Sequence, residues 1–405
     1  MNSVFQSMLV EDLIDEISMG PFGSNIRTSC FVSDGVPVLC GMNLSGFEVT
    51  DNGLRYVTEN KARSLGKAVA QRGDIVITHR GTLGQIAVIP KTSKYGRYVI
   101  SQSEFRVRCN SRVLPEYLVY YFHTPVGQWK LLSNRTQTGV PALSRPTSTF
   151  RQLDIEIPDI KTQEKVLRLI APLNEKINLN RAANDYLLDI LLCIFRQRFC
   201  SDTNVPNGTI CDLGNVVGGA TPSKKLRDNF AANGIGWITP KDLAKTSSIF
   251  ISHGAKDITN KGYCSCSATL MPKGSVLFSS RAPVGYVAIA AESLCTNQGF
   301  KSIVPHDNIG TAYVFCFLKE NATAIENTGS GTTFIEVSGR IMKEYPAYIP
   351  EEHDCKSFSQ LAEPILELIR INEKEKGNFE VLRDTLLPRL MSGGIDVSRI
   401  NCLIQ

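Results

Sequence analysis

The chain carries one ordered set of motifs twice, and this internal repeat limits its possible folds more than any other feature. The two halves align at an offset that starts near about 200 residues and shrinks through small deletions. GVPVLCGMNLSG, beginning at Gly35, matches GIGWITPKDLAK, beginning at Gly234. GDIVITHRGTLGQIAVIP from Gly73 matches GSVLFSSRAPVGYVAIAA from Gly274. We therefore expect two copies of one domain.

The second match predicts a β-hairpin in each half, with a β-branched apolar strand, a polar tip and a second apolar strand. It aligns Arg80 with Arg281 at the tip. A further strand is expected around Phe105 and around Phe300. Each copy continues with a short amphipathic helix, PEYLVYYFHTPVGQWKLL or TAYVFCFLKENATAI, and a polar loop, TQTGVPALS or GSGTTFIEVS. An apolar strand ending in Ile-Pro then leads into a long helix.

The two long helices have apolar residues at alternating steps of three and four, the heptad pattern of a helix that packs against another long helix. The positions of the first pattern, within about residues 159 to 200, are Ile170, Leu173, Ile177, Asn180, Asn184, Leu187, Leu191 and Ile194. Those of the second, within about residues 355 to 391, are Phe358, Leu361, Ile365, Leu368, Asn372, Glu375, Phe379, Leu382 and Leu386. Each pattern is apolar at its ends and polar near its middle.

Pairing between the two helices is expected, because each alone would expose a long apolar stripe to water. If a pseudo-twofold axis relates the halves, the helices run antiparallel and their central polar positions meet and fix the register. A helix of about 40 residues is on the order of 60 Å long and would act as a rigid spacer. Pro364 and Gly377 are unusual within a heptad helix and predict local kinks.

Composition is consistent with several globular cores in 405 residues and with a soluble, cytoplasmic protein. The N-terminal sequence has acidic residues where a secretory signal needs a basic start, and no apolar run is long enough to span a membrane. The 12 cysteines are irregularly spaced, which favours reduced thiols over a disulfide framework. A net charge of +5 is only mildly basic, so charge permits a DNA partner without requiring one.

The sequence offers no catalytic or metal-binding motif, and we expect no cofactor. Cys264 and Cys266 lack a second pair of ligands for zinc. There is neither an adenine-methyltransferase [DNS]-P-P-[FYW] string nor a Walker A motif. The stretch from Pro350 to Lys356 superficially resembles a nuclease pattern, but its spacing is too tight, and acidic residues favour a helix N-terminus. The five histidines are scattered along the chain.

The order of these motifs resembles the specificity subunits of type I restriction-modification enzymes. LRDTLLPRLMSGGIDV, from Leu382, is similar to the end of that family's distal conserved helix, and LLCIFRQRF, from Leu191, to the end of the central one. The resemblance covers essentially the whole chain. It implies a non-catalytic subunit with two target recognition domains joined by an antiparallel coiled coil, on which two modification subunits assemble and to which restriction subunits attach.

The expected fold class is therefore α+β, with two mixed α/β recognition domains, two long helices forming an antiparallel coiled coil and a pseudo-twofold repeat. The expected parts are a first recognition domain at 1–158, a central helix at 159–200, a linker at 201–210, a second recognition domain at 211–350, a distal helix at 351–394 and a tail at 395–405. Double-stranded DNA repeats every 34 to 36 Å or so, which suits two readers on a rigid spacer. Because the two sets of loops differ, the target should be asymmetric and bipartite.

Candidate DNA contacts are the Arg, Lys, Asn, Gln, Ser, Thr and His residues of the hairpin tips and neighbouring loops, types that read bases in the major groove. In the first half they are Asn25, Arg27, Asn43, His79, Arg80, Thr82, Gln102, Arg135, Gln137 and Arg145. In the second they are Ser223, Lys224, Lys225, Lys241, Arg281, Asn297, Gln298 and Thr332. Some of these side chains would contact only phosphate, and others would be plain solvated surface.

Two alternatives stay open at this point. The equivalence of Arg80 and Arg281 is also compatible with a shared structural salt bridge. A coiled-coil scaffold that joins protein-binding modules without DNA specificity would explain the heptads, although it does not explain the duplicated Arg-bearing hairpins and their polar loops.

Overall fold

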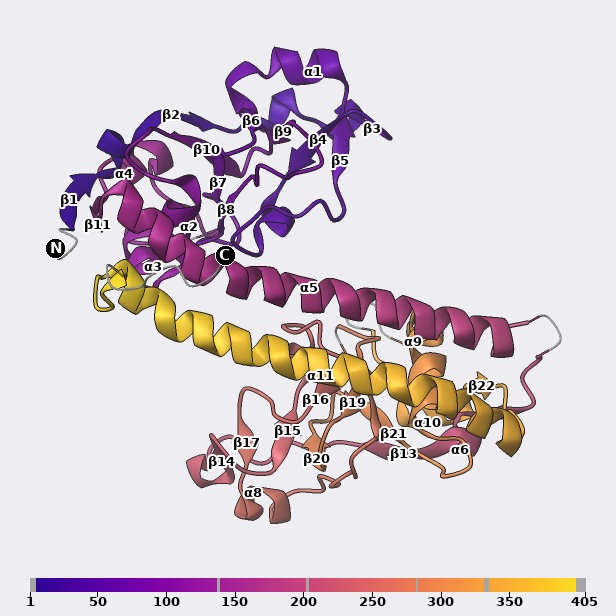
Figure 1. Ribbon diagram of the computed structural model, residues 1–405. Coiled ribbons are helices and arrows are strands. Elements are labelled where there is room, and N and C mark those ends of the chain that lie inside the picture. Colours follow the sequence, from indigo (N-terminus) through magenta and orange to yellow (C-terminus); the bar gives the residue numbers. More distant parts are fainter. Residues whose placement is uncertain (1–4, 137–138, 202–203, 282, 331–334, 398–405) are drawn as a thin grey trace. The chain divides into compact units, whose positions relative to one another are not determined.

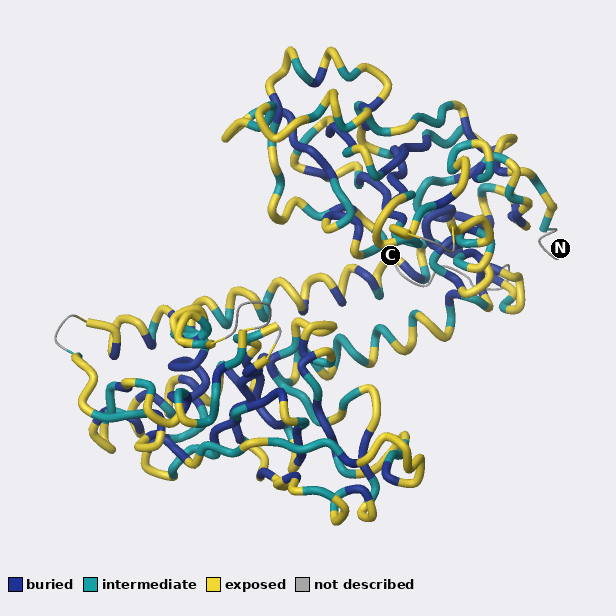
Figure 2. Tube along the Cα trace, turned by 180° about the vertical axis from the view of Figure 1, so that it is seen from behind, coloured by how far each residue is buried: buried dark blue, intermediate teal, exposed yellow. Residues whose placement is uncertain are grey.

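The computed structural model describes residues 5–136, 139–201, 204–281, 283–330 and 335–397 (Figure 1). The chain divides into two compact units, Met1–Lys176 together with Phe379–Gln405, and Ile177–Asn378. They are called unit 1 and unit 2. Buried residues follow the strands and one side of each long helix (Figure 2).

Unit 1 contains three sheets of short strands. The strands are β1 (Gln6–Leu9), β2 (Ile14–Met19), β3 (Phe31–Val32), β4 (Val36–Leu39), β5 (Arg55–Val57), β6 (Val69–Gln71), β7 (Ile75–Thr78), β8 (Ile86–Val88), β9 (Arg97–Ile100), β10 (Glu104–Cys109) and β11 (Asp154–Ile157). The helices are η1 (Val10–Leu13), η2 (Gly23–Asn25), η3 (Thr28–Cys30), η4 (Gly41–Leu44), α1 (Glu59–Ser64), η5 (Gly66–Ala68), α2 (Pro115–His123), α3 (Pro125–Leu131) and α4 (Pro146–Arg151).

The central sheet of unit 1 has the order β2-β10-β7-β8 and is antiparallel throughout. A five-stranded sheet, β3-β5-β4-β9-β6, contains one parallel pair, β4 with β9. One face of the central sheet is apolar, and Phe105 on β10 packs in the same core as Tyr117 of α2 and Ile170 of the first long helix. This core also takes in Leu387 and Leu390 from near the end of the second long helix.

Unit 2 repeats this plan. Its strands are β12 (Gly208–Thr209), β13 (Gly214–Gly218), β14 (Phe230–Ala231), β15 (Gly236–Ile238), β16 (Phe250–Ile251), β17 (Asp257–Ile258), β18 (Val276–Phe278), β19 (Val287–Ala290), β20 (Leu294–Thr296), β21 (Lys301–Pro305) and β22 (Pro346–Ala347). Its helices are α6 (Ile210–Leu213), η6 (Arg227–Asn229), α7 (Pro240–Leu243), α8 (Asn260–Cys264), α9 (Thr311–Asn327) and α10 (Gly339–Glu344).

The sheet order β13-β21-β18-β19-β16 extends the order found in unit 1 by one strand, and β15 pairs in parallel with β20 as β4 does with β9. Both predicted hairpins are confirmed, because β7 pairs antiparallel with β8, and β18 with β19. Ala87 and Ala288 occupy equivalent buried positions on the second strands. The same sequence pattern therefore yields the same local pairing in both units.

The long helices are α5 (Ile160–Phe199) and α11 (Glu352–Met391). In unit 2 their central polar positions meet as expected. Asn372 Nδ2 donates to Asn184 Oδ1 over 2.9 Å, and Asn180 Nδ2 donates to a carboxylate oxygen of Glu375 over 2.8 Å. Lower numbers on α5 therefore meet higher numbers on α11, so the two segments run antiparallel in this unit.

The heptad prediction for the second helix is wrong at three positions. Leu361, Leu368 and Leu382 are each 45% exposed, whereas Ala362 and Ile369 are fully buried. The reason is that α11 packs against the globular parts as well as against α5, so its buried face is not the narrow stripe of a two-stranded coiled coil.

One proline position accounts for a further difference from expectation. The amphipathic segment after Leu114 forms two helices, because Pro125 has no N–H to continue α2 and Thr124 caps α3 by accepting a hydrogen bond from the Gly127 N–H. Helix α11 is one helix through Pro364 and Gly377, and the local kinks expected there stay a prediction. The predicted domain limits stay a prediction.

Among the described residues, no helix is both long and apolar enough to cross a membrane. The cysteines of this part of the chain are free thiols.

Candidate nucleic-acid interface

In unit 1 the hairpin tip after β7 is hydrogen-bonded to the polar loop that precedes α4. Leu143 N donates to the carbonyl of His79 over 2.8 Å, and Gly81 N donates to the carbonyl of Pro141 over 2.9 Å. From the other side, Gln128 Nε2 of α3 donates to the carbonyl of Gly84 over 2.9 Å. Hydrogen bonds from the loop and from α3 therefore fix the tip from two sides.

Glycine is required at one position of each tip. Gly84 and its counterpart Gly285 both have a φ of 89°, a backbone conformation that residues with a Cβ rarely adopt. The alignment of these two glycines in the sequence therefore reflects the same turn geometry.

Polar side chains of three segments converge beside this tip. The His79 ring Nε2 donates to the carbonyl of Gln102 over 3.2 Å, and His79 N donates to the carbonyl of Ser103 over 2.9 Å. Burial lowers the pKa of His79, which leaves the ring neutral near pH 7. A Cβ added at Gly23 would lie 2.2 Å from Oε1 of Gln102, so the loop that carries Asn25 packs here too.

The solvent reaches most of the candidate contacts of unit 1. His79 is half-buried. The exposed candidate residues are Asn25, Arg27, Arg80, Thr82, Gln102, Arg135 and Arg145. Gln137 lies outside the described residues.

Arg145 has the left-handed backbone conformation, with a φ of 46°, and is alone among the described non-glycine residues in having a positive φ. Such strain persists only where the surroundings enforce it, and it is frequent at functional sites. Arg145 occupies the N-cap position of α4, and its carbonyl accepts a hydrogen bond from Thr149 N over 2.9 Å.

Asn43 does not belong to this surface. Its side chain is fully buried, and its Nδ2 donates to the carbonyls of Thr50 and Asn52, both over 2.9 Å. Its Oδ1 accepts a hydrogen bond from Cys40 N. The amide therefore stabilises a turn and is inaccessible to a ligand, so we remove Asn43 from the candidate contacts.

Unit 2 builds the equivalent surface with different side chains. Val337 N donates to the carbonyl of Ser280 over 2.9 Å, and Ser280 N donates to the carbonyl of Gly299 over 2.8 Å. These bonds correspond to those of Leu143 and His79 in unit 1. The loop after β13 packs against the segment between β20 and β21, since Thr221 Oγ1 hydrogen-bonds Oε1 of Gln298.

The remaining candidates of unit 2 differ in their exposure to solvent. Asn297 is half-buried, and its Oδ1 accepts a hydrogen bond from Gly299 N over 2.9 Å. The exposed ones are Ser223, Lys224, Lys225, Lys241, Arg281 and Gln298. Thr332 lies outside the described residues.

The alternative of a structural salt bridge applies to one of the two tip arginines. Arg281 is paired with Glu336, at 2.7 Å between the guanidinium and a carboxylate oxygen. Nearby, burial lowers the pKa of Lys301. No ion pair of Arg80 is found among the described residues, so the two equivalent arginines differ in their electrostatic surroundings.

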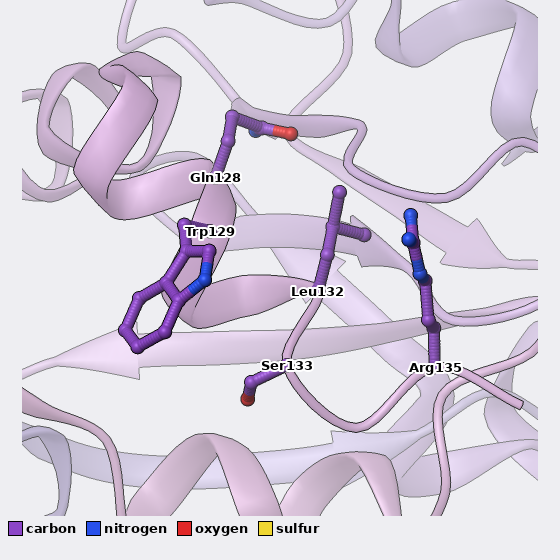
Figure 3. Close-up of a pocket in the computed structure, with 5 residues that line it drawn as sticks. All are labelled: Gln128, Trp129, Leu132, Ser133 and Arg135. Atoms are coloured by element: carbon purple, nitrogen blue, oxygen red, sulfur yellow. The ribbon is translucent and has the colours of Figure 1, made fainter.

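A hollow of about 460 Å³ next to the tip of unit 1 was not predicted from the sequence. Gln128, Trp129, Leu132, Ser133 and Arg135 line it (Figure 3). Trp129 is 72% exposed, which is unusual for so large an apolar side chain. The hollow offers an aromatic face and a guanidinium within reach of the same ligand, the combination that binds nucleic-acid bases and backbone.

A cluster of charged side chains on the central sheet of unit 1 has a different role. It consists of Glu16, Asp74, Arg106 and Arg108. Asp74 accepts hydrogen bonds from Arg108 Nε over 2.8 Å, and Arg106 donates to Glu16 over 2.6 Å. Arg106 is 3% exposed. These charged groups hydrogen-bond to one another within the fold, which leaves few of their donors and acceptors for a ligand. Among the described residues, no cluster of three or more His, Cys, Asp or Glu side chains could hold a metal ion.

Comparisons with known proteins connect this geometry to one family. Residues 204–376 match the model of the type I restriction modification DNA specificity domain. The MjaIX specificity subunit of Methanocaldococcus jannaschii is 37% identical over 46% of this chain and 43% of its own length, less than half of that relative. The HindI specificity subunit of Haemophilus influenzae is 23% identical over 94% of this chain and 99% of its own length.

The fold agrees with these sequence matches. A crystal structure of the S subunit of a type I restriction-modification system from M. genitalium covers 96% of both chains with a TM-score of 0.56 and 14% identity. At that identity the likeness concerns the fold alone. Sequence and fold comparisons thus agree that the chain is similar to specificity subunits of type I restriction-modification enzymes.

Proposed function

We propose that this protein is the DNA sequence-specificity subunit of a type I restriction-modification complex, in which each unit reads one half of an asymmetric bipartite site. The observation that carries the proposal is the duplicated hairpin tip, fastened in the same way in both units but surrounded by different polar side chains. A shared framework with separate contact residues is what two half-sites of different sequence require.

The contact surface of each unit is proposed to be the exposed candidates named above, with Asn43 left out and Trp129 added. Arg and Lys favour guanine, Asn and Gln favour adenine, and some of these side chains contact only phosphate and fix the register. The protein is the non-catalytic partner, and catalysis belongs to the modification and restriction subunits.

The long helices are proposed to form an antiparallel coiled-coil spacer within a pseudo-twofold arrangement. The contacts of Asn184 with Asn372 and of Asn180 with Glu375 support this, because buried polar pairs set the register of such helices. At 40 residues, each helix is about 60 Å long, which would hold two readers one to two turns of duplex DNA apart.

The same helices are proposed to dock two modification subunits, and restriction subunits attach to that core. Apolar side chains remain exposed on α11 at Leu361, Leu368 and Ile371, and on α5 at Leu179 and Tyr186. Leu361 and Leu368 are seven residues apart, as are Leu179 and Tyr186, so each helix presents a heptad-spaced stripe that a partner helix would cover. The complex is expected to work in the cytoplasm.

A net charge of +5 is low for a protein that holds DNA alone. We therefore expect the modification subunits to supply much of the phosphate contact, and tight binding to need the assembled complex.

A mobility-shift competition with the chain co-expressed with its modification subunits tests this function. The complex is expected to prefer one bipartite sequence over scrambled DNA by roughly a thousandfold or more at physiological salt. A complex that assembles but binds all sequences alike would contradict specificity and favour the scaffold alternative, which the comparisons do not favour.

A further inference from the structure

The ion pair at the tip of unit 2 is held by its backbone on both sides. Glu336 N donates to the carbonyl of Ser330 over 3.0 Å, and Ser330 N donates back over 3.1 Å. Glu336 also forms an antiparallel bridge with Arg281, to whose guanidinium its carboxylate is bonded over 2.7 Å. The backbone of Glu336, which carries the carboxylate, is therefore fixed in position.

Unit 1 has the same backbone bridge without the carboxylate. Arg80 bridges Ala142 there, and Thr136 N donates to the carbonyl of Ala142 over 2.8 Å, as Ser330 N does to that of Glu336. Ala142 is thus the structural counterpart of Glu336, and the fold of the tip does not depend on an ion pair.

The pair remains accessible to a ligand. The side chains of Arg281 and Glu336 are 45% and 41% exposed. A guanidinium has five N–H donors in a planar fork. The contact with Glu336 Oε1 involves Nη2, and no other hydrogen bond of the Arg281 side chain is found among the described residues.

A second cation lies close to the carboxylate. Lys301, at the start of β21, is half-buried and interacts electrostatically with both Glu336 and Arg281. Its Nζ also donates to the carbonyl of Phe300 over 3.3 Å. Two cations therefore surround one anion, so the carboxylate does not make this tip repel the DNA backbone.

We propose that Glu336 is a positioning residue that fixes the guanidinium of Arg281 for reading one base of the second half-site. The inference rests on the proposed function and adds to it. An arginine free to rotate contacts phosphates of any sequence, whereas one anchored at one side presents its remaining donors in one orientation. Because the counterpart position in unit 1 is alanine, Arg80 is not held in this way.

The test compares variants within the complex of the full chain and its modification subunits, using DNA in which each base of both half-sites is changed singly. The E336A variant is expected to lose discrimination at one position of the second half-site by on the order of tenfold, the size of one arginine-guanine contact, with the first half-site unchanged. The E336Q variant keeps an acceptor for the guanidinium and is expected to retain most of that discrimination.

A double-mutant cycle separates positioning from direct contact. The R281A variant should lose discrimination at the same base, and adding E336A to it should cause no further loss. The matched control is E367A, which breaks the exposed Arg370–Glu367 pair on α11 and should leave both half-sites as they were. If E336A impairs assembly, E336K is expected to give the same loss, because it repels the arginine.

Two results would overturn the inference. The first is a correctly assembled E336A complex that discriminates as the wild type does. The second is an additional loss when E336A is combined with R281A, which would mean that Glu336 acts independently. A wild-type complex without any sequence preference contradicts the proposed function itself, and is thereby distinguished from both.

Discussion

At the scale of single residues, Glu104 is a buried carboxyl on the strand behind the tip of unit 1. It is 1% exposed, and burial raises its pKa to about 7, although Ser101 Oγ donates to its Oε2 over 2.5 Å. Between pH 4.5 and 7 the folded state therefore retains a proton that the unfolded state loses. Stability falls as the pH rises through this window and stays lower above it.

Replacing Glu104 by Gln should remove this pH dependence, because an amide stays neutral and can still accept from Ser101. Above pH 7 the variant is expected to be more stable than the wild type by about 3 kcal/mol, with little difference at pH 4.5. Thermal unfolding of both proteins at pH 4.5, 6 and 8 checks this. The exposed Glu156→Gln serves as the control, and equal pH profiles for E104Q and the wild type would contradict the prediction.

The sequence predicted some of these residues and not others for a physical reason. Arg80 and Arg281 were identified because the repeat places them at the same step of the same hairpin. The burial of Asn43 and the pairing of Glu336 with Arg281 depend on loops that meet only after folding. Trp129 was missed because a tryptophan in an amphipathic helix is expected to be buried.

At the scale of elements, strand pairing was predictable and the buried faces of the long helices were only partly so. The apolar runs on either side of a polar tip predicted both hairpins, and the polar positions of the heptads met as expected. The heptads did not predict that Leu361 and Leu368 would be exposed, because a helix that contacts a globular core and another helix buries a wider arc.

Changing Leu361 and Leu368 together to Gln should weaken binding of the modification subunits with little effect on the isolated chain. The two side chains are already 45% exposed, so the remaining apolar area that a partner would cover contributes about 1 kcal/mol each, or roughly thirtyfold in affinity for the pair. Titration of labelled chain with modification subunit measures this. Lys374→Gln on the same helix is the control, and unchanged affinity would mean that another face docks the partner.

At the scale of the whole molecule, the chain does not divide at the ends of its motifs. The described core of unit 1 contains Leu387, Leu390 and Met391, although more than two hundred residues of sequence separate them from the rest of that unit. Unit 1 is therefore discontinuous in sequence, and an exchange of this unit has to include both of its segments.

Replacing residues 1–176 together with 379–405 by those of a similar specificity subunit should change one half of the methylated sequence and leave the other intact. Replacing 1–157 alone should give the same specificity but a less stable protein, because the new core would meet foreign side chains at Leu387 and Leu390. Sequencing of methylated sites in cells that carry each chimera, with unfolding of the purified proteins, tests both. A change in both half-sites would contradict independent readers.

The late contribution of α11 to the core of unit 1 also has a consequence for synthesis. While the ribosome is still translating unit 2, the nascent first unit lacks Leu387, Leu390 and Met391, so its apolar core is incomplete. We expect chaperones to bind the nascent chain for most of its translation. An mRNA truncated before codon 387 would yield a protein whose first unit cannot complete its apolar core. We expect proteases to degrade this product.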